Sequence, residues 1–232
     1  MRQPQFVAAL EGMVKNMGSF KAEGYKLCFN LSFYFCFVCI LVPSIIGVFL
    51  IDPEKRIARE TELFSYIFLL ICNLVVGSIL ASEYSGTLKD RMIAAADRKQ
   101  IFIAKAGMCL CSVTCIYLFY AVLFVITNDR VSILLLINQY KAILQQTLLL
   151  IGMAVIVKSF SALSVVTVVM LCIYKELSNL HLPDSMEYLY NNSYFVQFIR
   201  ADKLNAADGL FCLAAMGCAV VGYLVFRCQE IK

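Results

Sequence analysis

Long apolar runs separated by short polar segments dominate the chain. A helix of about 20 apolar residues is long enough to cross the hydrocarbon core of a bilayer. Six runs are candidates, although the fifth is short for a full crossing: 28–51, 63–82, 101–127, 133–157, 160–174 and 209–226. The mixed-charge stretch 54–62 is interpreted as a loop, and Pro43 inside the first run predicts a kink. This pattern predicts an all-α integral membrane protein with six transmembrane helices.

The first 27 residues show a different pattern, with apolar positions at nearly helical spacing between Lys and Glu residues. This spacing predicts an amphipathic helix that lies along the inner membrane surface. Gly12 and Gly18 weaken the prediction, and a solvated tail is the alternative. Residues 28–232 are then a single membrane domain.

The polar segment 83–105 interrupts the apolar runs between the second and third predicted spans. Thr87 with Asp90, and Asp97 with Gln100, have the spacing of capping boxes at helix starts. We therefore expect a short helix over about 88–95, followed by a new helix that continues into the membrane. A second long segment, 175–208, is rich in aromatic residues and predicts short outer helices broken near Pro183.

Composition agrees with a membrane protein. The 232 residues are 61% hydrophobic and 16% charged, and the mean hydropathy is +0.80, whereas soluble domains are about 45–50% apolar and about 25% charged. With six spans, most Lys and Arg residues fall on one side if both termini are cytoplasmic. We therefore expect a multi-pass plasma-membrane protein whose segment 83–105 faces the cytoplasm. The net charge of +4 follows from this asymmetry and calls for no nucleic-acid partner.

Catalytic and metal-binding patterns are missing from the sequence. There is one histidine, no Gly-x-x-x-x-Gly-Lys-Ser/Thr string and no Gly-x-Ser-x-Gly elbow. The 11 cysteines lie in or beside apolar runs and are interpreted as packing residues. A soft-metal site at Cys36-x-x-Cys39 is a less favoured alternative. We expect no enzymatic activity, metal or cofactor on this chain.

Polar residues inside the predicted spans are the candidates for a transport pathway, because such residues are costly in lipid. The polar residues in these spans are Asn73, Asn138, Gln139, Lys141, Gln145 and Gln146, of which Asn73, Asn138, Gln145 and Gln146 are taken as the pathway candidates. Interhelical hydrogen bonding is the structural alternative and is favoured for Asn73. If the fourth span begins near Ala142, part of this group lies outside the membrane. Small residues recur every fourth position in the last span and predict close helix packing, within the subunit or across a dimer: Ala214, Cys218 and Gly222.

The segment 83–105 resembles the loop between the second and third spans of ABC-2-type ABC transporter permeases. The resemblance rests on an acidic residue, a Gly-Thr-Leu string, and a basic residue that is followed by Ile and Lys: Glu83, Gly86, Thr87, Leu88, Arg98, Ile101 and Lys105. The family usually has Pro and Ser just before the Arg, where this chain has Ala95, Ala96 and Asp97. The overall layout is also similar, and the small permeases of bacteriocin or antimicrobial peptide export and immunity are closest in size.

This resemblance implies a permease subunit of an ATP-driven exporter for an amphipathic peptide, a lipid or a hydrophobic drug. The short loop helix would be a coupling helix that docks on a separate P-loop ATPase, which would hold ATP and Mg. Residues implied in coupling are Glu83, Gly86, Thr87, Leu88, Lys89, Asp90, Arg91, Met92, Ile93, Asp97 and Arg98. A second copy or a paralogue would complete the pathway. The alternatives are a solvated charged loop and a non-transporting membrane scaffold or sensor that binds a cytoplasmic partner through this loop.

Overall fold

The computed structural model describes residues 24, 31–81, 98–128, 131–177, 194–199 and 208–228. Helices account for nearly all of them, and these residues contain no strand. The elements are α2 (Leu31–Leu50), α3 (Pro53–Val76), the π-helical segment η1 (Gly77–Ala81), α5 (Arg98–Thr127), α6 (Ile133–Val157), α7 (Phe160–Leu177), α9 (Tyr194–Ile199) and α10 (Asp208–Cys228). The predicted N-terminal amphipathic helix, apart from Gly24, and the predicted helix at 88–95 lie outside the described residues.

Four helices in the described part of the chain are long and apolar enough to cross a membrane. They are Leu31–Leu50, Lys55–Ala81, Ile101–Thr127 and Ile133–Val157. The apolar parts of α7 and α10 are shorter, covering Phe160–Ile173 and Cys212–Cys228. The described part of the chain is therefore all helical, with the helix lengths and apolarity that suggest a membrane protein.

The start of α3 corrects the prediction that the second helix begins at Leu63. The helix begins at Pro53, so the stretch 54–62 is helical rather than a loop. Proline suits the first position of a helix because the N–H that it lacks has no intrahelical partner there. The mixed charges divide between two faces, since Lys55 and Arg59 are exposed whereas Glu60 is buried.

Other boundaries agree more closely with the prediction. Helix α6 has the predicted limits, so the alternative start near Ala142 is wrong. Helix α7 continues to Leu177 instead of ending at Tyr174. Pro43 lies within one assigned helix, α2.

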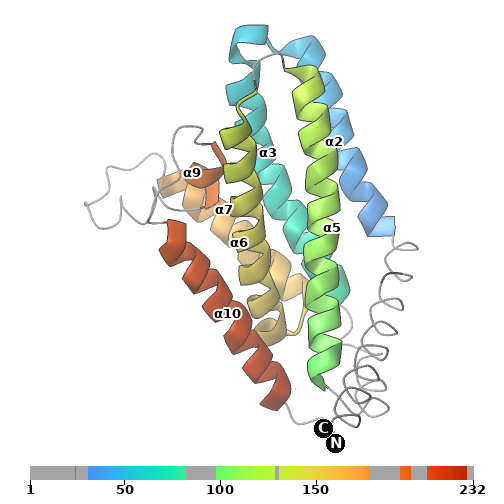
Figure 1. The fold of residues 1–232 in the computed structure, drawn as a ribbon, viewed down its shortest axis with the longest axis vertical. Helices are drawn as coiled ribbons and strands as arrows, with labels where there is room; N and C mark the ends of the chain where they lie inside the picture. Colours follow the sequence, from blue (N-terminus) through green and yellow to red (C-terminus); the bar gives the residue numbers. More distant parts are fainter. Residues whose placement is uncertain are drawn as a thin grey trace, which may run out of the picture.

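The helices form an elongated bundle in which α2, α3, α5 and α6 alternate in direction (Figure 1). Large side chains of α3, α5 and α6 fill the centre of the bundle, among them Phe64, Phe68, Tyr120, Phe124 and Ile143. Helix α2 packs on the outside of α3 and α5 and keeps an exposed apolar face. Lipid is the expected environment of such a face in a membrane protein.

The predicted small-residue stripe of the last helix packs within the subunit. A Cβ atom at Gly152 of α6 would overlap the backbone carbonyl of Cys218 in α10. A Cβ atom at Gly222 would lie 2.8 Å from the Gly152 Cα atom. The two backbones therefore meet at van der Waals distance, which is the contact that small residues permit. Ala214, the third residue of the stripe, is exposed.

Candidate functional site

The predicted coupling residues 83–97 lie outside the described residues, and of this set only the backbone of Arg98, the first residue of α5, is described. The helix ends on both sides of this segment are described. The C-terminal end of η1 and the N-terminal end of α5 lie at the lower end of the bundle in Figure 1, together with the turn between α6 and α7 and the C-terminal end of α10.

The two ends of the bundle differ in exposed charge. Among the described residues, the lower end exposes the basic side chains of Lys99, Lys158 and Arg227 and no acidic one. The opposite end exposes a mixture of acidic and basic side chains: Asp52, Lys55, Arg59 and Glu62. A basic end is typical of the cytoplasmic side of a membrane protein.

The predicted pathway residues Asn73, Asn138, Gln145 and Gln146 are all buried. Thr147 Oγ1 of α6, next to Gln146, donates a hydrogen bond of 3.5 Å to Cys72 Sγ of α3, so the two helices meet near this group. Asn73, the residue after Cys72, donates its Nδ2 hydrogen to Ser164 Oγ of α7 at 3.1 Å. This bond is the interhelical interaction that was favoured for Asn73. The other three residues lie along α6, within the bundle.

A buried seam of rings and polar atoms joins α3, α5 and α6. The Tyr120 ring lies 4.6 Å from the Phe64 ring and 5.1 Å from the Phe68 ring, measured between centroids. Tyr117 Oη donates a hydrogen bond of 2.6 Å to the Leu136 carbonyl at the start of α6. The polar members of this seam include Gln139, which the sequence marks as a polar residue inside a predicted span, and Tyr117 and Tyr120, which the sequence did not single out.

Gln139 is the clearest of these members. Its side chain is fully buried beside the Tyr120 hydroxyl, and neither its amide oxygen nor its amide nitrogen forms a well-shaped hydrogen bond in the described part of the chain. The same holds for the buried hydroxyl of Tyr120 and for Gln146 Nε2. Each buried polar group left without a partner costs about 1–3 kcal/mol. Several poorly paired polar groups in one seam lower the stability of the folded protein, and this cost favours a role for the seam beyond packing.

Helix α9 closes one side of this seam. Phe198 is fully buried, and its ring centroid lies 5.9 Å from that of Phe68. The helix belongs to the aromatic-rich segment 175–208, so a short helix between the last two long helices is confirmed. This short, aromatic-rich helix packs against both α3 and α6.

A polar clamp at the upper end of the bundle was also missed. The Arg56 guanidinium donates to the carbonyls of Thr127 at 3.1 Å, Val48 at 3.1 Å and Ile51 at 3.3 Å. It therefore joins the C-terminal ends of α2 and α5 to the first turn of α3. One turn along α3, Glu60 Oε2 accepts a 2.9 Å hydrogen bond from Asn128 Nδ2. The sequence signal that could have predicted this clamp is the string Asp52-Pro53, because it marks a helix start. The charged residues that follow it then lie on the faces of a helix.

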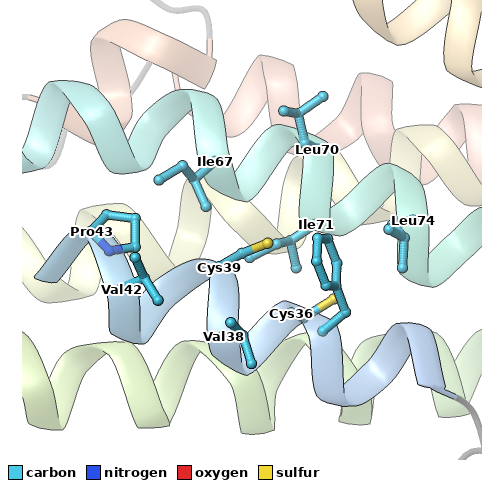
Figure 2. Close-up of a pocket in the computed structure, with 10 residues that line it drawn as sticks. Cys36, Val38, Cys39, Val42, Pro43, Ile67, Leu70, Ile71 and Leu74 are labelled. Atoms are coloured by element: carbon cyan, nitrogen blue, oxygen red, sulfur yellow. The ribbon is translucent and has the colours of Figure 1, made fainter.

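An apolar groove lies between α2 and α3 on the outside of the bundle (Figure 2). Its volume is about 550 Å³, and its lining includes Cys36, Cys39, Pro43, Ile67 and Leu70. The described residues contain no cluster of three or more His, Cys, Asp or Glu side chains that could hold a metal ion. The groove offers the two thiols no further ligands, so packing remains the better interpretation of the Cys36-x-x-Cys39 spacing.

Comparison with known proteins does not assign the chain to a family. No protein-family model matches it, and no curated protein matches it significantly.

Proposed function

We propose that the chain is the transmembrane permease subunit of an ATP-driven exporter of the ABC-2 type. One observation carries the proposal. The segment with the coupling-loop resemblance connects η1 to α5, and these two elements end at the same, basic end of the bundle (Figure 1). A cytoplasmic ATPase that pushes on this segment would act directly on two of the four long apolar helices.

The buried seam supports a pathway between α6 and its neighbours α3 and α5. Gln139 and Tyr120 hold buried polar atoms that form no well-shaped hydrogen bond with the described residues, in an interior made mostly of apolar side chains. Such atoms gain partners when the helices separate and a polar group of the cargo, or water, enters. The aromatic and apolar walls suit an amphipathic peptide, a lipid or a hydrophobic drug, which would cross the plasma membrane by alternating access.

The remaining parts of the proposal concern partners and topology. The P-loop ATPase would be a separate subunit that holds ATP and Mg, since the sequence contains no P-loop of its own. Six spans would include α7 and α10 and would leave both termini in the cytoplasm. A second copy or a paralogue would complete the pathway, as in the family that the loop resembles. Membrane lipid would contact the exposed face of α2 and its groove.

The test is co-purification of the chain with the P-loop ATPase encoded nearest to it, followed by measurement of ATP hydrolysis. The wild-type chain should bind the ATPase and stimulate it. The triple variant Asp90→Ala, Arg91→Ala, Arg98→Ala should insert into the membrane normally but return hydrolysis to the rate of the ATPase alone. A matched control removes two basic residues and one acidic residue from the other end: Lys55→Ala, Arg59→Ala and Glu62→Ala.

The control should keep the wild-type stimulation, because its three residues are exposed at the end of the bundle away from the predicted loop. Full stimulation by the loop variant would refute the assignment of the loop. Binding without any stimulation by the wild-type chain would favour the scaffold or sensor function instead.

A further inference from the structure

Lys105 is a buried lysine near the start of α5. Its side chain is 1% exposed, and Nζ donates a hydrogen bond of 3.2 Å to the backbone carbonyl of Ile79. Ionisable side chains inside a membrane helix bundle are costly and mark functional positions more often than neutral ones do. The contact also links two segments that are adjacent in space but separated in the chain by residues 82–97.

The acceptor of this bond lies in an unusual stretch of backbone. Ile79 is at the centre of η1, the π-helical segment that ends α3. A π-helical turn contains one more residue than an α-helical turn, and such turns are rare and occur frequently at functional sites. The inserted residue changes the hydrogen-bond pattern of the carbonyls around it, and the Lys105 ammonium supplies a donor to one of them.

Helix α7 contacts the same segment. The Phe160 ring, at the start of α7, lies so close to Gly77 that a Cβ atom there would overlap it. Gly77 opens η1, and Lys105 reaches the middle of the segment. The π-helical geometry is therefore held from two sides, by α5 and by α7.

The geometry of η1 sets the direction in which the chain leaves α3. If η1 reverted to an α-helix, Ala81 would turn by about 100° around the helix axis and shift by about 1.5 Å along it. Helix η1 ends at Ala81, and α5 begins at Arg98. The bond between Lys105 of α5 and Ile79 of η1 therefore fixes these two helix ends relative to each other.

We propose that Lys105 and η1 form a joint that sets the rotation of the α3 end against α5. Its consequence for the ATPase rests on the proposed function: the joint fixes the helix ends at Ala81 and Arg98, through which this partner would act. Lys105 is then a positioning residue, which acts through the backbone of η1.

The first arm of the test needs no partner. The full chain is purified in detergent micelles as wild type, Lys105→Met, Lys105→Arg and Lys99→Met, and amide hydrogen exchange is measured for peptides covering 74–82. Lys105→Met should speed exchange in this region about tenfold or more, since a hydrogen bond from a charged donor is lost. Lys105→Arg, which keeps a charged donor, should restore much of the protection.

Lys99→Met is the matched control, because Lys99 is an exposed lysine on the same helix. It should leave exchange unchanged. Slowed or unchanged exchange in Lys105→Met, or exchange that rises equally in every helix, would overturn the joint. The failure of Lys105→Arg to restore protection would do the same.

The second arm measures binding of the ATPase to the same four variants. Lys105→Met should weaken binding about tenfold relative to Lys99→Met, and Lys105→Arg should recover it. Equal binding by Lys105→Met and Lys99→Met would overturn the orienting role of the joint. Loss of binding by the wild type itself would instead refute the proposed function, and the exchange arm would still decide whether the joint exists.

Discussion

The Arg56 clamp gives the most direct test of the structure. Replacing Arg56 with Met keeps an apolar stem of similar length but removes the guanidinium, and with it three hydrogen bonds to the carbonyls of Val48, Ile51 and Thr127. These bonds join the C-terminal ends of two helices to a third. Carbonyls at a helix C-terminus also carry the negative end of the helix dipole, which a cation stabilises.

The magnitude follows from the geometry. A hydrogen bond to a charged group contributes about 1.5–3 kcal/mol when buried, and less where water competes. The bonds to Thr127 and Ile51 are partly buried and the bond to Val48 is exposed. We therefore count about 1 kcal/mol for each, or about 3 kcal/mol in total. Arg56 Nε is buried without a hydrogen-bond partner in the described part of the chain, so its removal returns about 1 kcal/mol.

The net expectation for Arg56→Met is a loss of about 2 kcal/mol in the free energy of unfolding. Reversible unfolding in mixed micelles with increasing SDS measures this quantity. Arg59→Met is the matched control, because Arg59 lies nearly one turn further along the same helix with an exposed side chain. Arg56→Lys should show an intermediate loss, since an ammonium lacks the planar fork that reaches both helix ends. A loss in Arg56→Met within about 0.5 kcal/mol of the control would refute the clamp.

Two further predictions use the same unfolding assay. Gly152→Leu should destabilise the bundle by about 1–3 kcal/mol, because the new side chain would overlap α10 at Cys218. The control Gly217→Leu should be nearly neutral, because a Cβ atom at Gly217 meets no atom within 4 Å. Equal effects of the two variants would show that α6 and α10 do not meet at Gly152. Gln139→Leu should raise the free energy of unfolding by about 1–2 kcal/mol, because it removes two buried polar atoms that form no well-shaped hydrogen bond with the described residues. Under the proposed function it should also lower transport. A destabilised variant would show that the amide is hydrogen-bonded in the folded protein, with the adjacent Tyr120 hydroxyl as the nearest candidate partner.

Apolar length predicted the helices well, and local signals predicted some of their ends. The limits of α6 agree with the prediction because the flanking strings Asn128–Arg130 and Lys158–Ser159 are short and polar. The start of α3 was wrong because mixed charge was taken as a loop signal. The proline at its first turn was the better guide.

The seam and the joint could not be predicted in the same way. The sequence marks Asn138, Gln139, Gln145 and Gln146 as polar residues of α6, but which of their polar atoms are left without a well-formed hydrogen bond depends on contacts with α3 and α5. The π-helical segment η1 is contacted by Lys105 and Phe160, which are distant in the chain. Sequence patterns report local preference, whereas both features arise from contacts between helices.

The distribution of satisfied polar groups suggests how such a bundle would open. At the upper end, Arg56 and Asn128 bind α2, α3 and α5 together through hydrogen bonds. Between the ends, the amide of Gln139 and the hydroxyl of Tyr120 lie beside each other without a well-formed hydrogen bond to the described residues. Separation of α6 from α5 would break the bond from Tyr117 to the Leu136 carbonyl and the bond between Thr114 and Tyr140, but it would release these two poorly paired groups to new partners. Under the proposed function, the seam would therefore open around Gln139 and Tyr120, while the clamp holds the opposite end closed.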